Sequence, residues 1–456
     1  MTDFRESAHA APIRSVEQLV EQLHAAGRPR ARWMIGTEYE KVVVDRATGR
    51  AAPFSGPRGI ETLLRELARR YGWEPREENG RTVALAREGA SITLEPGGQL
   101  ELSGVQCPNI HCAHEELRTH VREVVSVGTD LGLASLGLGI QPVSTVDEIE
   151  WVPKRRYAIM GPYMTRVGTL GQRMMKQTAT VQANIDYSDE RDAMQKLRVG
   201  MGIAPLVNAM FANSSVSEGR LNGYMSYRGH IWTDTDPARC GLLPFVFRDG
   251  AGFGDYVDWA LDVPLYFILR NGSYVTDVTG IPFRRFLRDG AAGTRATMDD
   301  WNLHLTTLFP EVRLKGYIEI RSADSQPPER MLALPALVKG VFYTADCLDA
   351  AWDLVKRWSF EEHVALYRDV HREALLARFR GIKVLELARE LYAIGEEGLR
   401  RQAVFDEEGR DERVYLERLG EQLDRGRSPA RVIAEKWVGE WNRQAEPLIR
   451  YAEYRA

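Results

Sequence analysis

The segment IGTEYEKVVVD, residues 35–45, decides how the fold is built. It is typical of a β-strand, in which successive side chains point to opposite faces and residues i and i+2 share one face. Glu38 and Glu40 therefore lie side by side on one face of the predicted strand, and Tyr39 lies on the other. Two neighbouring carboxylates repel each other, so this face of the strand requires a positive partner or water.

Three other strand-like segments also carry polar side chains on one face and apolar side chains on the other. They are KGYIEIRSA (315–323), TVQANIDYS (180–188) and SITLEPGGQLELSG (91–104), the last with a Pro-Gly-Gly turn in its middle. The polar faces consist of Glu319 and Arg321 in the first, Gln182, Asn184 and Asp186 in the second, and Glu95, Gln99 and Glu101 in the third. Carboxylates thus recur on one face of several predicted strands.

Two interpretations of these acidic strands remain open. The first is a half-exposed sheet whose acids face water. The second is a sheet face that lines a chamber, where the acids share a divalent cation that relieves their repulsion. Hard cations such as Mg²⁺ prefer oxygen ligands and are commonly held by carboxylates together with substrate phosphates. The functional interpretation is therefore a metal and nucleotide chamber.

A second unusual segment is SEGRLNGYMSYRGHIWTDTDPARCGLLPF, residues 217–245, which mixes glycines, aromatic residues and charges without a clear period. We expect a long loop here. One interpretation is an ordinary surface loop. The other is a binding loop, because long ordered loops in compact enzymes often bind ligands and because Arg228 and Trp232 could hold a carboxylate.

The composition is that of a globular protein with nearly balanced charge. The chain has 456 residues, 60 Lys and Arg against 64 Asp and Glu, and a formal net charge of −4. A slightly acidic balance gives no general attraction to nucleic acid, so no nucleic-acid partner is predicted. No uncharged apolar run reaches the about 18 residues of a membrane span, and the polar N-terminus is unlike a secretion signal. We therefore predict no membrane partner and a cytoplasmic location.

The four cysteines, Cys107, Cys112, Cys240 and Cys347, show no disulfide framework and fit a reducing compartment. The segment CPNIHCAH, residues 107–114, raises the question of a zinc site, but its spacing matches no common finger or ribbon. We favour the interpretation that this segment enters a helix at Cys112 and that its cysteines pack there.

The order of predicted elements indicates an α+β fold. A helix capped by Ser15 is expected over residues 15–26, mixed strands and helices follow, and long amphipathic helices dominate the C-terminal third. We divide the chain into an N-terminal helix and lead-in (1–32), a catalytic core (33–345) and a helical C-terminal region packed on the core (346–456).

A series of segments between about residue 32 and residue 337 follows one order along the chain. The segments are IGTEYEK, SITLEPGGQLELSG, GIQP, TVQANIDYS, FANS, HIWTDTD, LPFVF, YVDWALDVPLYF, LTTLFPEVRLKGYIEIRSAD and ALPAL. Together they resemble the plant and proteobacterial type of glutamate–cysteine ligase, within the glutamine-synthetase-like carboxylate–amine ligases. The resemblance covers two-thirds of the chain and is much more specific than any single motif.

The resemblance implies a curved, mainly antiparallel sheet that forms a funnel-shaped active site, with helices on the outside. It also implies the reaction: ATP phosphorylates the γ-carboxylate of L-glutamate, and the amine of L-cysteine then displaces phosphate. The product is γ-glutamylcysteine, the first intermediate of glutathione synthesis. The implied cofactors are ATP and Mg²⁺, with Mn²⁺ as a substitute, and the expected state is a monomer or homodimer.

The roles of the family's site residues can be carried over to matching positions of this chain. The implied metal ligands are Glu38, Glu40, Glu95, Glu101 and Glu319. Arg321 matches a residue that contacts the transferred phosphoryl group, and Gln182 matches a position near the nucleotide phosphates. Arg228 and Trp232 fall in the loop that shapes the amino-acid pocket, with Arg228 expected to bind a substrate carboxylate.

Two alternatives to this activity remain. One is a ligase of the same class that joins glutamate to an amine other than cysteine, because a thiol pocket leaves no clear motif. The other is a catalytically silent sensor on the same fold. The full set of acids together with Arg321 argues against the silent sensor, because such a protein has no chemical need for all of them.

Overall fold

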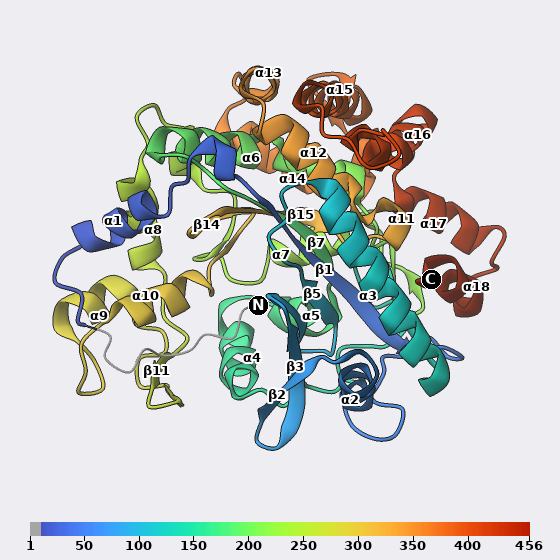
Figure 1. Cartoon of the computed structure of the whole chain (residues 1–456), viewed down its shortest axis with the longest axis horizontal. Helices are drawn as coiled ribbons and strands as arrows, with labels where there is room; N and C mark the ends of the chain where they lie inside the picture. Colours follow the sequence, from blue (N-terminus) through green and yellow to red (C-terminus); the bar gives the residue numbers. More distant parts are fainter. Residues whose placement is uncertain (1–10) are drawn as a thin grey trace.

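A computed structural model describes residues 11–456 of the chain and contains one large, entirely antiparallel sheet at its centre (Figure 1). Within the described residues the sheet has nine strands in the order β14-β15-β7-β1-β5-β4-β3-β2, with β6 paired to the far end of β1. These strands are β1 (Ile35–Asp45), β2 (Glu74–Glu78), β3 (Arg81–Arg87), β4 (Ala90–Leu94), β5 (Leu100–Ser103), β6 (Leu133–Leu136), β7 (Thr180–Ile185), β14 (Val312–Leu314) and β15 (Ile318–Asp324). The predicted α+β fold with a large antiparallel sheet is confirmed.

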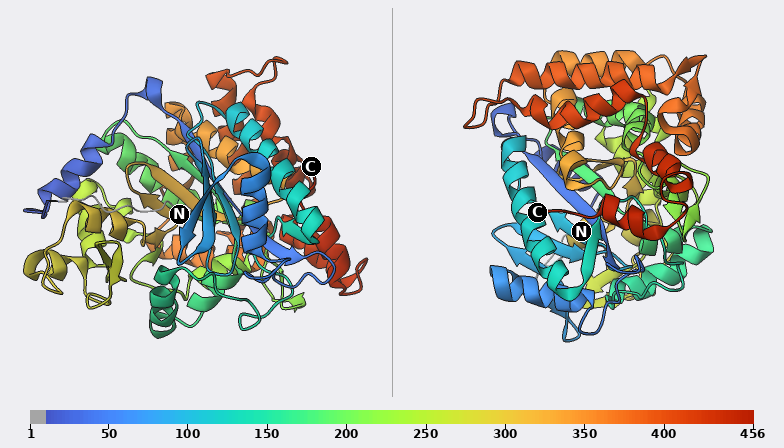
Figure 2. Two further views of the ribbon diagram at one scale, coloured as in Figure 1. Left: turned by 60° about the horizontal axis from the view of Figure 1, so that its bottom comes forward. Right: turned by 90° about the vertical axis from the view of Figure 1, so that its right-hand side faces the viewer.

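Helices surround this sheet, and the C-terminal ones form an outer layer at the upper right of Figure 1. The helices are α1 (Glu17–Ala25), α2 (Ile60–Tyr71), α3 (Ile110–Leu131), α4 (Arg155–Val167), α5 (Gly171–Gln177), α6 (Glu190–Phe211), α7 (Tyr227–Trp232), α8 (Phe253–Asp262), α9 (Phe283–Asp289), α10 (Met298–Leu305), α11 (Pro328–Met331), α12 (Ala333–Phe342), α13 (Ala345–Val355), α14 (Phe360–Glu373), α15 (Val384–Gln402), α16 (Glu417–Arg425), α17 (Pro429–Val438) and α18 (Ala445–Ala452). Figure 2 shows α13, α15 and α16 stacked outside the helices that touch the sheet.

The two faces of β1 have different surroundings, as its alternating sequence predicts. Thr37, Tyr39 and Lys41 are buried on the face turned away from the acids, and Lys41 Nζ lies 2.6 Å from the His120 ring of α3. Helix α3 runs beside β1 in all three views (Figures 1 and 2). The opposite face, with Glu38 and Glu40, remains partly exposed and carries the chemistry described below.

The described residues contain no single helix that is long and apolar enough to cross a membrane. The segments Pro328–Phe342 and Ala345–Val355 meet that test only as a pair and are bent by 99° relative to each other.

The division of the chain into three parts stays a prediction. Residues 1–10 of the predicted lead-in lie outside the described residues. One hydrophobic core cluster extends along the chain from Leu19 in α1 to Tyr454 near the C-terminus and includes buried residues of α12 and α15. A second, smaller cluster joins α17 and α18 to the distal halves of β1 and β6. The helical C-terminal region therefore contributes to the same core as the sheet.

Two local predictions need correction. Helix α1 begins at Glu17 with Val16 at its N-cap, and no side chain caps it, so Ser15 is not the cap. Residues 217–245 are not a continuous loop, because they contain β9 (Arg220–Leu221), helix α7, β10 (Cys240–Gly241) and the start of a short 3-10 helix, Pro244–Phe247. Strand β9 pairs with β8 (Val216–Ser217), and the Ser226 side chain caps α7.

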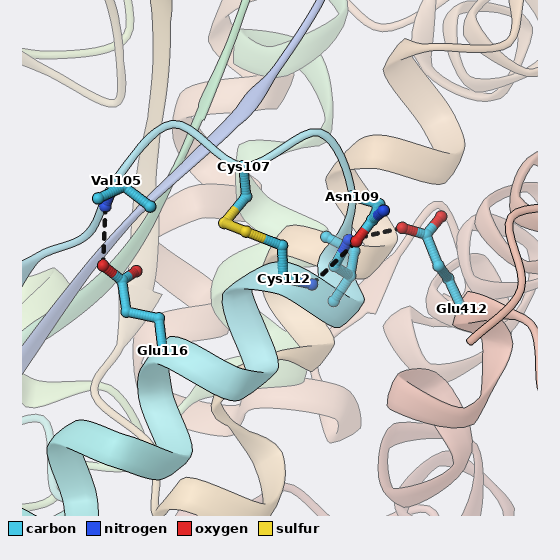
Figure 3. Close-up of a disulfide and its surroundings, with 7 residues drawn as sticks. Val105, Cys107, Asn109, Cys112, Glu116 and Glu412 are labelled. Carbon is cyan, nitrogen blue, oxygen red and sulfur yellow. Dashed lines mark hydrogen bonds between the residues drawn. A yellow bond between two sulfur atoms is a disulfide. The ribbon is translucent and has the colours of Figure 1, made fainter. Parts of the chain in front are cut away.

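Cys107 and Cys112 form a disulfide, which could not be read from the spacing of the cysteines in the sequence (Figure 3). Their Cα atoms lie 5.7 Å apart because Cys112 sits in the first turn of α3, which folds back toward the preceding segment. The zinc alternative is excluded as well, since both thiols are used. The helix entry itself is confirmed, with α3 beginning at Ile110 after Asn109 as its N-cap.

The disulfide connects α3 to the start of the acidic strand. The backbone of Cys107 exchanges two hydrogen bonds with Ile35, at 2.7 and 2.9 Å. Around the bridge, Asn109 accepts a hydrogen bond from the Cys112 backbone at 2.8 Å, and Glu412 accepts one from Ile110 at 2.6 Å (Figure 3). The first turn of α3 is thus tied both to β1 and to the C-terminal region.

Candidate active site

A cavity of about 440 Å³ opens on the polar face of the sheet. Its walls come from β1, the turn between β4 and β5, β7, α7 and the β14–β15 hairpin. Eight of the nine predicted site residues line it: Glu38, Glu40, Glu95, Glu101, Gln182, Arg228, Trp232 and Arg321. The ninth, Glu319, is fully buried directly behind this lining. The structure therefore brings all nine residues together, although they come from segments far apart in the sequence.

Strand pairing explains how the acids meet. In the β1–β5 ladder Glu40 lies opposite Glu101, and in the β1–β7 ladder Glu38 lies opposite Gln182. In the β15–β7 ladder Glu319 lies opposite Asn184, which extends the polar face by one strand. Directly opposed side chains in an antiparallel ladder are close neighbours. The register of β1, β5, β7 and β15 thus converts separate acidic segments into one surface.

The acids are held by neutral donors. The Thr180 backbone donates to Glu40 Oε2 at 2.9 Å, and the Ser103 hydroxyl donates to Glu101 Oε1 at 2.7 Å. Asn184 Nδ2 donates to Glu38 Oε1 at 3.1 Å. These contacts orient the carboxylates without neutralising their charge.

Mutual repulsion and burial oppose ionisation of Glu38, Glu40 and Glu95. Burial, followed by the nearby Glu319 and Glu101, raises the pKa of Glu38. Burial, then Glu95 and Glu101, raises the pKa of Glu40 well above its ordinary value. The pKa of Glu95 is raised by burial and by Glu101. A bound cation would relieve this repulsion, so the cluster has the electrostatic character of a cation site.

The donor set fits a hard divalent cation. It consists of carboxylate oxygens, and one further oxygen near them, Asn184 Oδ1, is buried without a hydrogen-bond partner among the described residues. Among residues 11–456, however, no three Asp, Glu, His or Cys side chains converge tightly enough to form a ready coordination shell. Repulsion between like charges is the physical reason for such spacing when no cation lies between them.

Glu319 differs from the other acids because it is paired with cations. Its Oε2 lies 2.6 Å from Arg313 and 2.8 Å from Arg321, and its Oε1 lies 3.3 Å from Lys315. Burial opposes ionisation of Glu319, but Arg313, Lys315 and Arg321 together hold its pKa well below its ordinary value. Glu319 is thus a carboxylate with three cationic partners of its own.

The two predicted arginines lie next to each other. Arg321 donates to Gln182 Oε1 at 2.6 Å as well as to Glu319, and its guanidinium lies 6.0 Å from the Trp232 ring. Arg228 is 4% exposed and donates to the Arg321 carbonyl oxygen at 3.1 Å. Within residues 11–456, Arg228 forms no ion pair with a carboxylate. Its charge is therefore available for an anionic ligand in the cavity.

Arg313 and Lys315 also line the cavity, but neither was predicted as a site residue from the sequence. A signal was present, because VRLKGYIEIR contains two short alternating segments around Lys315-Gly316. Pairing these segments as a hairpin places Arg313 opposite Glu319, as the structure does. Asn184 was recognised as part of a polar strand face but was not assigned a role.

The fold and the site define a class of protein: one in which buried carboxylates face arginines across a cavity on an antiparallel sheet, suited to cations and anionic substrates. The chain belongs to glutamate–cysteine ligase family 2, because the model of that family matches residues 34–450.

Several plant proteins are similar to this chain over nearly all of its length. Glutamate–cysteine ligase B, chloroplastic, from Oryza sativa subsp. japonica is 41% identical over 441 residues, 96% of this chain and 87% of the rice protein. The chloroplastic glutamate–cysteine ligase of Arabidopsis thaliana is 40% identical, with coverage of 96% and 83%. That of Solanum lycopersicum is 40% identical, with coverage of 98% and 84%.

Among solved structures, a glutamate–cysteine ligase from Francisella tularensis in complex with AMP resembles this fold. The TM-score is 0.53 at 13% identity, over 91% of this chain and 86% of the other. At this identity the likeness supports the fold alone.

The prediction of a cytoplasmic location is contradicted by these comparisons. The rice, Arabidopsis and tomato relatives are all named as chloroplastic proteins. The cysteine usage and the polarity of the first residues, on which the prediction was based, do not distinguish the cytoplasm from a chloroplast.

Proposed function

We propose that this protein is an ATP-dependent glutamate–cysteine ligase, which joins the γ-carboxylate of L-glutamate to the amine of L-cysteine in the first step of glutathione synthesis. The observation that carries the proposal is the cavity of a family member in which Glu38, Glu40, Glu95 and Glu101 face Arg228, Arg313 and Arg321. Such a cavity suits a reaction that brings ATP and glutamate, both anions, into contact. Fixed positive groups and bound cations lower the barrier of such reactions by stabilising developing charge.

The proposed reaction has two steps. The γ-carboxylate of glutamate attacks the terminal phosphorus of ATP, which forms γ-glutamyl phosphate and releases ADP. The amine of cysteine then attacks the acyl carbon, the amide bond forms and inorganic phosphate leaves. No protein nucleophile is needed, so the side chains act by orientation and by charge.

We assign Glu38, Glu40, Glu95 and Glu101 as carboxylates that would hold Mg²⁺ or Mn²⁺. Glu319 would contribute Oε1, since its Oε2 already accepts from Arg313 and Arg321. A bound divalent cation would neutralise phosphate oxygens and polarise the transferred group.

On the opposite wall, we assign Arg321 to the transferred phosphoryl group, with Gln182 orienting its guanidinium near the nucleotide phosphates. Glu319 Oε2 accepts a hydrogen bond from the same guanidinium at 2.8 Å. We assign Arg228 to a carboxylate of glutamate, because it is buried and forms no ion pair with residues 11–456. The guanidinium carbons of Arg228 and Arg321 each lie 6.0 Å from the centre of the Trp232 ring. Trp232 therefore packs beside both arginines and closes this side of the pocket.

The test is phosphate release from ATP and glutamate, measured with cysteine, with other amines and with no acceptor. Release that depends on cysteine, together with mass-spectrometric detection of γ-glutamylcysteine, supports the proposal. Release that depends on another amine supports a ligase with a different acceptor. No release under any condition supports the silent sensor and overturns the proposal.

A further inference from the structure

The last residue of β15, Asp324, is fully buried behind the arginine side of the cavity and does not line it. Its Oδ2 accepts hydrogen bonds from the Asn213 backbone and the Ser214 hydroxyl, both at 2.7 Å, and its Oδ1 accepts from the Ser226 hydroxyl at 2.9 Å. Within residues 11–456, Asp324 forms no ion pair. Burial of a carboxylate without a cation partner costs folding free energy. This cost indicates that Asp324 has a role besides packing.

The two serines also accept hydrogen bonds from backbone N–H groups of helix α7, so they connect Asp324 to this helix. The Ser214 oxygen accepts from the Arg228 backbone N–H at 3.1 Å, and the Ser226 oxygen accepts from the Gly229 N–H at 3.1 Å. A hydroxyl has one proton and two acceptor lone pairs. Because each proton is donated to Asp324, an oxygen lone pair of each serine remains directed at α7. The carboxylate therefore sets the direction of both hydroxyls.

The surroundings leave Asp324 little freedom to move. A Cβ added at Gly139 would lie 2.6 Å from the Asp324 Cβ, so only glycine permits the approach of the two segments. Asn208 adds a second connection, since its Nδ2 lies 3.2 Å from the Ser226 hydroxyl and 3.0 Å from the Ser322 carbonyl oxygen. Strand β15 and the start of α7 are thus held in one arrangement.

This arrangement connects the two arginines of the site. Arg321 lies on β15, three residues before Asp324, and its carbonyl oxygen accepts from Arg228 Nη2 at 3.1 Å. The Arg228 backbone is held through Ser214 by Asp324, and its side chain by Arg321. Strand β15 therefore holds Arg228 at two points: its backbone N–H through Ser214 and Asp324, and its guanidinium through the Arg321 carbonyl oxygen.

We propose that Asp324 is a positioning residue for glutamate recognition, which acts through Ser214 and Ser226 to hold Arg228 against β15. The inference rests on the proposed role of Arg228 as the group that binds a glutamate carboxylate. Asp324 itself contacts no substrate in this scheme.

The experiment is steady-state kinetics of Asp324→Asn, alone and combined with Arg228→Lys. The amide keeps the size of the carboxylate, but its nitrogen donates and cannot accept from a serine hydroxyl. One hydroxyl then loses its acceptor and turns away from α7. We expect the KM for glutamate to rise roughly tenfold, on the scale of one hydrogen bond to a charged group. The KM for ATP should change less than about twofold, because binding that is uniform along the reaction appears in KM alone.

The double variant separates positioning from a general loss of structure. If Asp324 acts through Arg228, the KM for glutamate in the double variant should be close to that of Arg228→Lys alone. Multiplication of the two single effects would overturn the inference. An unchanged KM for glutamate in Arg228→Lys would overturn the proposed role of Arg228. The single variant alone gives this result, so it can be distinguished from a failure of the inference about Asp324.

Asp300→Asn provides a matched control. Asp300 is also a buried carboxylate that accepts from a helix-capping hydroxyl, at Thr297, but it lies outside the cavity lining. We expect this variant to lose stability and to keep both KM values. If Asp324→Asn does not fold, Ser226→Ala and Ser214→Ala test the same contacts. An unchanged KM for glutamate in both serine variants would overturn the inference.

Discussion

The two walls of the cavity carry charges of opposite sign and differ in how those charges are paired. The acidic wall consists of Glu38, Glu40, Glu95 and Glu101, and the basic wall consists of Arg228, Arg313, Lys315 and Arg321. On the acidic wall neutral donors orient Glu38 and Glu40, and burial raises the pKa of Glu38, Glu40 and Glu95. On the basic wall one carboxylate, Glu319, forms ion pairs with three of the cations.

This difference indicates what each wall lacks. On the acidic wall, burial and neighbouring carboxylates oppose the charge of Glu38, Glu40 and Glu95, and a divalent cation would balance that charge. The basic wall has an internal counter-charge that fixes Arg321, while Arg228 forms no ion pair with residues 11–456. Glu319 and Gln182 therefore hold Arg321 in place, whereas in the proposed function a divalent cation would organise the acids.

The largest effect is expected from removing a charge on the acidic wall. Glu38→Gln should lower turnover roughly 10²-fold or more, the scale for loss of one preorganised electrostatic group. The variant should also bind Mn²⁺ more weakly, which titration followed by electron paramagnetic resonance measures without reference to activity. Full activity of the wild-type protein in EDTA would contradict the proposal that the acidic wall binds a divalent cation.

Glu123→Gln is a control for this variant. Glu123 is a buried carboxylate on α3 that pairs with Arg87 at 2.9 Å and does not line the cavity. Its replacement should leave turnover and Mn²⁺ affinity near the wild-type values. A similar loss in both variants would mean that the Glu38 effect is structural.

The next effect concerns Arg321 on the basic wall. Arg321→Lys keeps the charge but loses the planar guanidinium, whose Nη1 donates to both Gln182 and Glu319. We expect turnover to fall roughly tenfold or more, with the KM for glutamate nearly unchanged, because the group meets charge that develops during phosphoryl transfer. A rise in the KM for glutamate without loss of turnover would place Arg321 in the amino-acid pocket instead.

A change at Arg228 should have the opposite kinetic signature. Arg228→Lys should raise the KM for glutamate roughly tenfold and spare that for ATP, because a group that holds the substrate carboxylate in ground and transition states alike affects binding. Varying each substrate in turn gives both constants. An unchanged constant for glutamate would make α7 a structural element of the wall only.

The smallest effect on catalysis is expected from the disulfide behind the acidic wall. Replacing Cys107 and Cys112 by Ser should lower the free energy of unfolding by about 2 kcal/mol, the chain-entropy value for so short a loop. Denaturant titration with and without dithiothreitol measures this loss. Turnover with α-aminobutyrate, an amine without a thiol, should change little. A several-fold change would mean that the start of β1 controls the geometry of Glu38 and Glu40.

The sequence by itself determined which side chains share a face. The two-residue period of strands predicted that Glu38 and Glu40 lie together, as do Glu319 and Arg321, and the Pro-Gly-Gly turn predicted that Glu95 and Glu101 flank a reversal. These relations are local and depend only on backbone geometry, so they could be predicted without the fold. The order of the matching segments also indicated the family.

Only the tertiary structure decided which faces meet and which charges are compensated. The opposition of Glu40 to Glu101, and of Glu319 to Asn184, depends on strand register between segments that local patterns do not pair. The disulfide depends on where α3 begins, because one helical turn brings Cys112 back to Cys107. The contacts of Asp324 with Ser214 and Ser226 join residues about a hundred positions apart. Long-range hydrogen bonds and ion pairs of this kind leave no periodic trace in the sequence, so their existence follows from the packing of the whole chain.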